Sequence, residues 1–345
     1  MKNMTVKHKP RIALVGTDSM IGKEIMDVLA KKEFPVEKAE FFDPDVKEEF
    51  SKLTQFKGEP RVVNAFKDTF LNDVDLVFLA GDKKTNNQIG VQAEKKKVFA
   101  IDLSGAFWEQ EKIPVVVSGI NDEVLWEPEC HLVANPHPVT IMLSHIQKVA
   151  AQKFGVKKTV AFILQPVSAF GKSGVEELAA QSADILNRGS GQKKVFKAQI
   201  AFNLLSQSES VDKDGFSGIE KRILSELKRV LKKNDMSLSL VQAPVFHGYS
   251  VMIYMELNKE TDIKSLEQAY KETSYFQCYS SSLECPVSPA LTAGKNEIHI
   301  GQVKKDMIFP NGFWLWAVAD NLTVGSALNA YEIALTMISD EKGSS

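Results

Sequence analysis

The stretch RIALVGTDSMIG, residues 11–22, decides the fold of this chain, which has 345 residues. The apolar run 12–15 ends at Gly16, and the segment after it has its apolar side chains at helical spacing: Ile21, Ile25, Val28 and Leu29. An apolar run that turns at a glycine into an amphipathic segment is typical of a buried strand followed by a helix. The stretch therefore predicts a βα unit near the start of the chain.

The segments that follow repeat this alternation. A short strand is predicted at 39–42, ending at Asp43, and two apolar strands are predicted at 74–80 and 98–103 with a helix at 85–96 between them. Near-continuous apolar strands that alternate with helices are typical of a parallel sheet that is buried on both faces. We therefore predict an α/β fold that opens with a Rossmann-like, doubly wound parallel sheet.

The pattern changes after residue 135, where longer strands and helices follow without regular alternation. The predicted elements are a helix at 140–154, strands at 159–167 and 237–245, a helix at 219–233 and a final helix at 325–338. The segment 181–214 is rich in Ser, Gln and Lys and has no long apolar run, so we expect much of it to be irregular. This part of the chain is predicted to form a second, α+β domain.

Composition excludes several classes of function. Forty-two basic and 44 acidic residues give a net charge of −2, which provides no electrostatic surface for nucleic acid or for an anionic membrane. Cys130, Cys278 and Cys285 are too few for a disulfide framework, and no C-x-x-C pair suggests a metal site. The N-terminus is polar, and no apolar run approaches the roughly 20 residues of a membrane span. We expect a cytoplasmic protein with no metal, no nucleic-acid partner and no membrane contact.

Six phrases occur in an order that points to one family. They are IDLSGAF at 101–107, ANP at 134–136, QPVSAFGK at 165–172, IAFN at 200–203, DNL at 320–322 and GSALNA at 325–330. Over nearly its whole length the chain resembles the aspartate-semialdehyde dehydrogenase family, which serves amino-acid biosynthesis. The resemblance implies a reaction that passes through a covalent thioester intermediate, with NADP(H) as the partner that exchanges the hydride. It also implies a dinucleotide-binding domain at 1–135, a substrate and dimerisation domain at 136–318, and a C-terminal helix within 319–345 that packs on the first domain.

Two of the side chains that carry the family's chemistry are replaced in the matching phrases. The nucleophile's phrase, Asn-Pro-Asn-Cys-Ser-Thr in the family, here reads NPHPVT at 135–140 and places Pro138 at the cysteine position. Proline has no nucleophile and no backbone N–H. The family's acid/base histidine, in a Gly-His-Ser phrase, corresponds to Tyr249. A phenol has a pKa of about 10 and is therefore a poor general acid or base at neutral pH.

Both arginines that the family uses for its anionic reactants are replaced as well. The arginine that clamps the substrate carboxylate corresponds to Gln242, and the phosphate-binding arginine corresponds to Trp108. Gln165, which in the family helps to position the substrate, is retained. Arg222 lies in the helix where the family keeps a lysine for phosphate, and it is the one surviving anion ligand that the resemblance offers.

Three other residues could rescue the chemistry. A shift of one or two residues in the match would make His247 the acid/base, and His137 could act as a nucleophile beside the lost position. A structural role is the simpler interpretation of both. Cys130 lies eight residues before Pro138 across a predicted strand, so we expect a core cysteine there.

The turn after the first strand also departs from the family's Gly-x-x-Gly-x-x-Gly pattern. Ser19 replaces the middle glycine, which lets the backbone approach the pyrophosphate, and Asp18 adds a negative charge beside it. Asp43, at the end of the second strand, would repel the 2′-phosphate of NADP, so NAD is favoured over NADP if any dinucleotide binds. The residues predicted to contact such a cofactor are Gly16, Ser19, Met20, Ile21, Gly22, Asp43, Gly171 and Asn321. Gly16 and Gly22 could instead serve only the tight turn and helix packing.

These losses together favour a non-catalytic homologue, similar to the Usg-type paralogues of the family. We expect a homodimer with a binding or assembly role. What the dimer binds, a small-molecule ligand or a partner enzyme, is left open by the sequence. The alternative is an NAD(P)-dependent oxidoreductase that acts on a semialdehyde-like substrate without a thiol, with Tyr249 or His247 as its acid/base.

Overall fold

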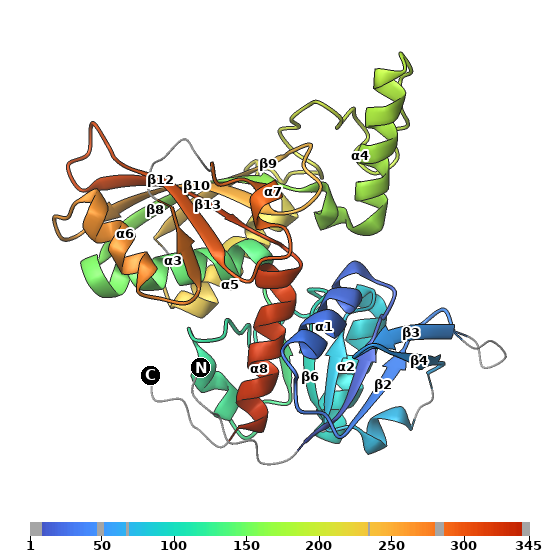
Figure 1. Cartoon of the computed structure of the whole chain (residues 1–345). Coiled ribbons are helices and arrows are strands. Elements are labelled where there is room, and N and C mark those ends of the chain that lie inside the picture. The colour runs from blue at the N-terminus through green and yellow to red at the C-terminus, as the bar shows by residue number, and fades with distance from the viewer. Residues whose placement is uncertain (1–8, 47–51, 67–68, 234, 280–285, 340–345) are drawn as a thin grey trace. The chain divides into compact units, whose positions relative to one another are not determined.

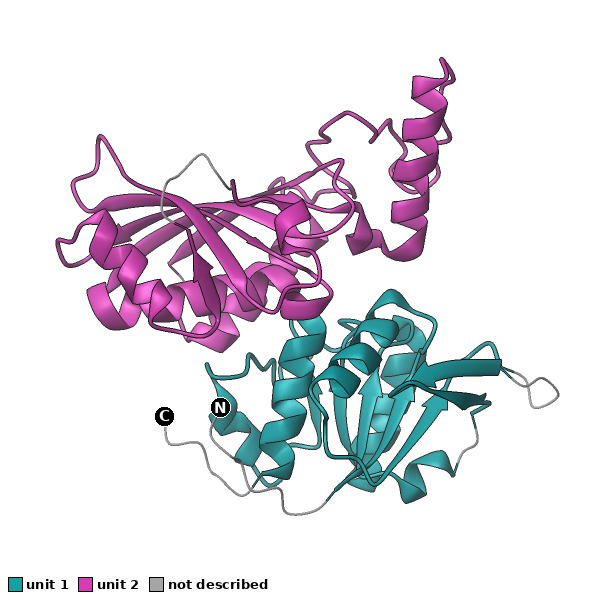
Figure 2. Cartoon of the chain, viewed as in Figure 1, with its two compact units in different colours: residues 1–137, 326–345 teal, residues 138–325 magenta. Residues whose placement is uncertain are grey.

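The computed structural model describes residues 9–46, 52–66, 69–233, 235–279 and 286–339. The chain divides into two compact units (Figure 2). Unit 1 comprises residues 1–137 and 326–345, and unit 2 comprises residues 138–325. The resemblance predicts these boundaries at residues 135 and 318. No helix in the described part of the chain is long and apolar enough to cross a membrane.

Unit 1 is built on a seven-stranded sheet with the strand order β3-β4-β2-β1-β5-β6-β7. Its strands are β1 (Arg11–Val15), β2 (Lys38–Phe42), β3 (Lys52–Phe56), β4 (Glu59–Asn64), β5 (Leu76–Leu79), β6 (Phe99–Asp102) and β7 (Leu132–Ala134). All neighbouring strands are parallel except β3 and β4, which form an antiparallel hairpin at one edge. The predicted doubly wound parallel sheet is therefore confirmed, and the hairpin is an addition that periodicity did not reveal.

The helices of unit 1 pack against this sheet (Figure 1). They are α1 (Met20–Lys31), α2 (Lys83–Lys96) and α8 (Leu328–Ile338), with 3₁₀ turns at Phe70–Asp73 and Asp122–Trp126. Helix α8 follows a π-helical turn at Thr323–Ala327. Its Tyr331 ring lies edge-on to Phe34, 5.7 Å away between centroids, in one core with Ile25 and Leu29 of α1. The prediction that the C-terminal helix returns to the first domain is confirmed.

Unit 2 contains a six-stranded sheet with the order β11-β12-β13-β10-β8-β9. Its strands are β8 (Val156–Gln165), β9 (Met236–Gln242), β10 (Tyr249–Leu257), β11 (Phe276–Cys278), β12 (Ile298–Lys305) and β13 (Gly312–Ala319). The pairs β8–β9 and β11–β12 are parallel and the others antiparallel. Helices α3 (Pro138–Phe154), α5 (Gly218–Leu231) and α6 (Ile263–Lys271) pack on one face, and α7 (Pro289–Thr292) is a single turn. This is the predicted α+β domain.

Helix α4 (Gly171–Leu186), which follows a 3₁₀ turn at Val167–Phe170, is not predicted by the sequence. It extends into the segment 181–214 as far as Leu186. The rest of that segment contains no helix or strand, so the expectation that much of it is irregular is confirmed. Its Glu177 carboxylate accepts bonds from the backbone N–H groups of Lys194, Val195 and Phe196. The helix thus uses its own polar side chain to hold the irregular segment, a contact that apolar periodicity cannot show.

Candidate functional site

Pro138, at the position where the resemblance places the nucleophile, is the first residue of α3. Proline suits this position because its φ is already helical and the N–H that it lacks would have no partner within the helix. The backbone of Gly325 lies against it, since a Cβ added to Gly325 would come within 2.6 Å of the Pro138 Cβ. The position therefore holds a closely packed ring that supports the start of the helix.

The residues of the retained phrases in unit 1 hold strands and α8 together. The backbone N–H of Asn135 donates to Asp102 O at 2.8 Å, and its side-chain Oδ1 accepts from Asn329 Nδ2 at 2.7 Å. Asn329 in turn accepts from the backbone N–H of Ser118 at 2.8 Å. These amides are buried, so each bond replaces one to water. The retained phrases contribute a frame that holds β6, β7 and α8.

The loop that carries Trp108 is fixed by a buried carboxylate. Asp102 is fully buried and accepts from the backbone N–H groups of Ser104 at 3.0 Å and Ala106 at 2.7 Å. Phe107 is buried against Gly90, where an added Cβ would lie 2.6 Å from its ring. Trp108 follows in a partly buried position. Its indole has one neutral N–H and cannot replace a charged, bidentate guanidinium as a phosphate ligand.

Three positions of the predicted site in unit 2 form one buried cluster. Tyr249 Oη donates to Gln165 Oε1 at 3.1 Å, and Gln165 Nε2 donates to Gln242 Oε1 at 3.0 Å. Gln242 Nε2 donates back to the backbone carbonyl of Gln165 at 2.9 Å. Gln165 and Gln242 are directly paired at the ends of β8 and β9, and Tyr249 begins β10. The side chains at these family positions therefore bind one another.

Tyr249 is held in its neutral form. It is 1% exposed, and burial raises its pKa well above the usual value, with the nearby Arg222 charge offsetting only part of this effect. A neutral phenol that donates to Gln165 cannot take up a proton at neutral pH. The alternative acid/base, His247, is partly buried in the loop that precedes β10.

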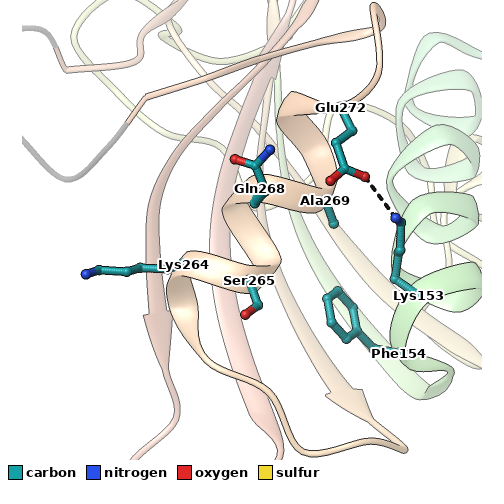
Figure 3. Close-up of a pocket in the computed structure, with 7 residues that line it drawn as sticks. All are labelled: Lys153, Phe154, Lys264, Ser265, Gln268, Ala269 and Glu272. Carbon is teal, nitrogen blue, oxygen red and sulfur yellow. Dashed lines mark hydrogen bonds and ion pairs between the residues drawn. The ribbon is translucent and has the colours of Figure 1, made fainter.

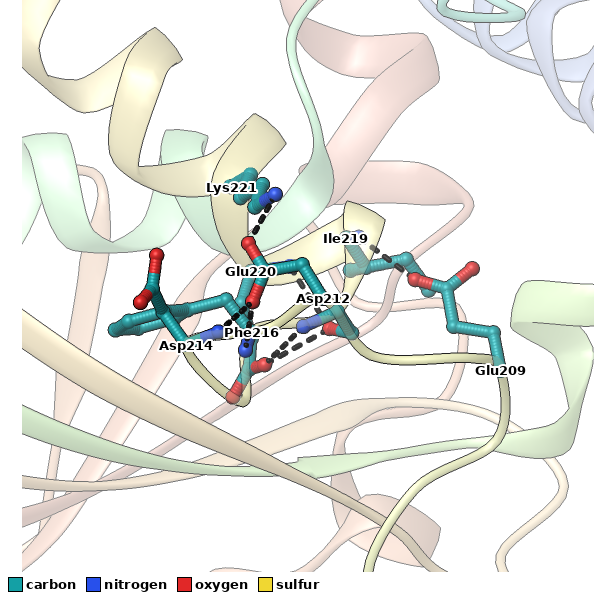
Figure 4. A network of polar contacts seen from close by, with 8 residues as sticks. Glu209, Asp212, Asp214, Phe216, Ile219, Glu220 and Lys221 are labelled. Carbon is teal, nitrogen blue, oxygen red and sulfur yellow. Dashed lines mark hydrogen bonds and ion pairs between the residues drawn. The ribbon is translucent and has the colours of Figure 1, made fainter.

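Helix α5 places Arg222 beside a buried carboxylate. Ser217 and Glu220 form a capping box at the start of the helix, and Glu209 accepts from the backbone N–H of Ile219 at 2.8 Å (Figure 4). One turn further on, Arg222 Nε lies 2.7 Å from Oε1 of the fully buried Glu226.

Glu226 also accepts from Thr140 Oγ1 of α3 at 2.7 Å. The Arg222 charge, which the resemblance offered as an anion ligand, is thus balanced within its own helix.

The turn before α1 needs its two glycines for packing. Gly16 has φ +88°, and a Cβ there would lie 2.4 Å from the backbone nitrogen of Gly81. A Cβ on Gly22 would lie 2.0 Å from the carbonyl oxygen of Gly16. Ser19 is the N-cap of α1, and its hydroxyl accepts from the Gly22 N–H at 2.8 Å. Met20 and Ile21 form the first turn of the helix and are partly buried.

Asp43 lies at the centre of a charged cluster that the sequence did not reveal. It is 3% exposed, and its carboxylate accepts a bond from Thr17 Oγ1. Lys52 Nζ, from β3, lies 3.0 Å from the same carboxylate and also pairs with Asp18. Burial lowers the pKa of Lys52, but its bonds to Asp18 and Asp43 outweigh this and raise the pKa overall. Lys52 was missed because only the edge hairpin brings it to this turn.

Gly171 and Asn321 both lie in unit 2. Gly171 has φ +67° at the turn into α4, a conformation that favours glycine. Asn321 Oδ1 accepts from Ser168 Oγ at 3.1 Å and from the backbone N–H of Gly248 at 2.9 Å. Asn321 therefore links its own phrase, at 320–322, to the phrases that contain Ser168 and Gly248. A contact of Gly171 or Asn321 with a cofactor stays a prediction.

Both units of the chain match models of known protein families. Residues 11–127 match the family model described as "Semialdehyde dehydrogenase, NAD binding domain", and residues 148–324 match "Semialdehyde dehydrogenase, dimerisation domain". The chain belongs to the aspartate-semialdehyde dehydrogenase family.

Among its relatives, the aspartate-semialdehyde dehydrogenases of Rickettsia conorii and Aquifex aeolicus are 27% and 28% identical to it. The alignments cover 98% of this chain and 99% of the Rickettsia protein, and 96% of this chain and 98% of the Aquifex protein. The crystal structure of aspartate semialdehyde dehydrogenase II from Vibrio cholerae superposes with a TM-score of 0.90 at 25% identity, over 96% of this chain and 99% of that one. The predicted family and fold are confirmed.

Two surface hollows lie away from the predicted residues of this family member. One, of about 440 Å³, is formed by the end of α3 and by α6 and is bordered by the Lys153–Glu272 ion pair of 2.8 Å (Figure 3). The other, of about 690 Å³, includes Arg11, Asp75 and Lys97. The residues that line the two hollows include none of the predicted catalytic or cofactor positions.

Cys130 and His137, the other two residues considered for the family's chemistry, are both buried. Cys130 is buried, as expected, and burial raises the pKa of its thiol to about 11, so it is protonated at neutral pH. His137 is 7% exposed beside the start of α3. In the described ranges, no group of three or more His, Cys, Asp and Glu side chains is arranged to hold a metal ion.

Proposed function

We propose that this chain is a non-catalytic member of the family, similar to its Usg-type paralogues, which has kept the fold and lost the thiol chemistry. The observation that carries the proposal is Pro138, the first residue of α3 and packed on Gly325. A helix N-terminus is the environment that lowers the pKa of a cysteine thiol and activates it. Here the same environment stabilises a proline, which has no group to activate.

The second support is the closed cluster of Gln165, Gln242 and Tyr249. All three are at most 1% exposed. A substrate carboxylate at this position would have to break the bonds between Gln165 and Gln242, and it would gain no positive charge in return. Charge-assisted pairing of an arginine with a carboxylate is worth roughly 1.5 to 3 kcal/mol, and this cluster offers none of it.

We further propose that the protein acts as a homodimer through unit 2. The sheet face opposite α3, α5 and α6 carries two cross-strand rows, Val160–Tyr254–Trp314 and Phe162–Met252–Trp316. Val160 and Phe162 are each 44% exposed. An exposed apolar face of this kind is typical of a subunit interface, and unit 2 matches the model named for dimerisation. A cytoplasmic binding or assembly role, towards a small-molecule ligand or a partner enzyme, fits this arrangement.

The test of inactivity is a gain-of-function series. Purified wild type, Pro138→Cys, and the quadruple variant Pro138→Cys, Trp108→Arg, Gln242→Arg, Tyr249→His are assayed with aspartate semialdehyde, phosphate and either NADP or NAD. An active family member serves as the positive control. We expect no turnover from the wild type and none from the single variant, because three further roles stay unfilled.

Substantial turnover by the wild type would overturn the proposal. Turnover by Pro138→Cys alone would refute the argument that four roles were lost together. Removal of a covalent nucleophile typically costs on the order of 10⁶ in rate, so the assay must detect rates far below that of the control.

A further inference from the structure

We propose that the turn before α1 has become a self-contained structural element, held by Ser19 and by the Asp18–Lys52–Asp43 cluster, and that it binds no dinucleotide. This goes beyond the proposed loss of catalysis, because a chain without a nucleophile could still bind a cofactor. It also disagrees with the description of the matching family model as an NAD-binding domain. Two independent features of unit 1 carry the inference.

The first feature is the N-terminus of α1. In a dinucleotide site the first βα turn presents free backbone N–H groups to the pyrophosphate, and the turn must allow close approach. Here the Ser19 hydroxyl accepts from the Gly22 N–H at 2.8 Å and donates to the Gly16 carbonyl at 2.9 Å. A phosphate would have to displace this hydroxyl, and the Ser19 Cβ stands where the family has no side chain.

The second feature is the end of β2. An acidic residue selects NAD in such folds by accepting a bond from the ribose 2′-OH, which requires an accessible carboxylate. Asp43 is 3% exposed, and it is bonded by Thr17, itself 1% exposed, and by Lys52. The side chains that would recognise the ribose are already partners of one another.

The charge of the cluster also opposes a nucleotide. Two carboxylates, Asp18 and Asp43, face one ammonium group, Lys52, so the cluster has an excess of negative charge. Asp18 is the most exposed member, with 64% of its side chain accessible. A pyrophosphate brought to the turn would meet this excess without a free cation from the cluster to balance it.

The test is direct titration of the full chain with NAD, NADP and ADP-ribose by calorimetry and by thermal shift. We expect no binding heat and no rise in melting temperature at millimolar ligand. The matched variant is Ser19→Gly with Asp18→Ala, which removes the cap and the exposed charge and leaves Lys52 in place. Glycine is tolerated at an N-cap, so this variant should fold, and its urea transition checks that it does.

We expect the double variant to bind at least one of the dinucleotides, with at least a tenfold gain in affinity over the wild type. Binding of NAD or NADP by the wild type would overturn the proposal. So would a folded double variant that binds no better than the wild type, because the Ser19 cap and the Asp18 charge, which this variant removes, would then not be what excludes the dinucleotide. Wild-type NADP binding that disappears in Lys52→Met would instead identify Lys52 as a phosphate ligand. None of these readouts depends on catalysis, so they are separate from the turnover assays.

Discussion

The turn before α1 in unit 1 and the Gln165–Gln242–Tyr249 cluster in unit 2 differ in how their side chains are bonded. In both, side chains at predicted site positions bond to neighbouring side chains. In unit 1 the partners are charged and partly exposed, with 30% of the Lys52 side chain accessible. In unit 2 they are neutral and at most 1% exposed. The difference shows that side chains at such positions can satisfy one another through ion pairs, which salt screens, or through buried amides, which salt does not screen.

The largest expected effect is the acid sensitivity of unit 2. Burial, and to a smaller extent the charge of Lys148, lowers the pKa of His145 in α3 to about 3. In the unfolded chain the pKa of this histidine is about 6.5. Between pH 3 and pH 6.5 the unfolded state therefore binds more protons than the folded state. Stability from this residue is therefore present above pH 6.5 and is lost as the pH falls towards 3, amounting to about 3 kcal/mol by pH 4.

Hydrogen exchange of unit 2 at pH 7 and pH 4 measures this loss separately from unit 1. His145→Phe is the matched control, because it can keep the ring stacking on Tyr275, now 4.0 Å between centroids, and cannot titrate. An equal loss of protection in wild type and variant would contradict the assignment.

The next effect concerns the buried amide cluster. Gln165→Met removes the bond from Tyr249 Oη to Gln165 Oε1 and the bond from Gln165 Nε2 to Gln242 Oε1. We expect a loss of about 2 to 3 kcal/mol in urea unfolding, since removing one partner of a buried hydrogen bond costs roughly 1 to 3 kcal/mol. The double variant Gln165→Met, Tyr249→Phe should recover part of that loss. If the two single losses simply add in the double variant, the cluster is not a coupled network.

A smaller effect is expected for the charged cluster. Lys52→Met leaves Asp43 without its cation, and we expect a loss of about 1 to 2 kcal/mol at low salt, discounted for the exposure of Lys52 and Asp18. The loss should shrink in 1 M NaCl, whereas the Gln165→Met loss should not change. Lys31→Met is the control, because its ion pair with Asp27 is 3.5 Å long and exposed. A Lys52 effect that is independent of salt would remove the contrast between the two regions.

The smallest effect is that of the cap. Ser19→Ala removes the acceptor for the Gly22 N–H, and we expect a loss of about 1 kcal/mol, whereas Ser19→Gly should cost only a few tenths. Thermal unfolding of the wild type and the two variants side by side measures both differences. A Ser19→Ala variant as stable as the wild type would mean that the hydroxyl contributes nothing as a cap.

Much of the fold could be predicted from the sequence, and less of the site. The βα unit at 11–31 and the parallel sheet follow from apolar periodicity, which reports burial directly. The return of α8 to the first unit was expected from the resemblance to the family. The β3–β4 hairpin and α4 were not recognised. Leu53 and Val62 of the hairpin are 65% and 54% exposed, and Glu177 of α4 binds backbone groups. Neither element therefore has the periodic buried apolar face by which a strand or helix is predicted.

The sequence by itself established that the chain carries the family's phrases, and it predicts that the family has other residues at the positions of Pro138, Trp108, Gln242, Tyr249 and Ser19. Residue identity alone establishes that no thiol can act from Pro138. Only the tertiary structure decided what these side chains contact. It pairs Gln165 with Gln242 across adjacent strands and brings Lys52 from an edge hairpin to Asp43. The physical reason is that hydrogen bonds and ion pairs form between atoms a few ångströms apart, and that proximity is created by strand pairing between segments distant in the sequence.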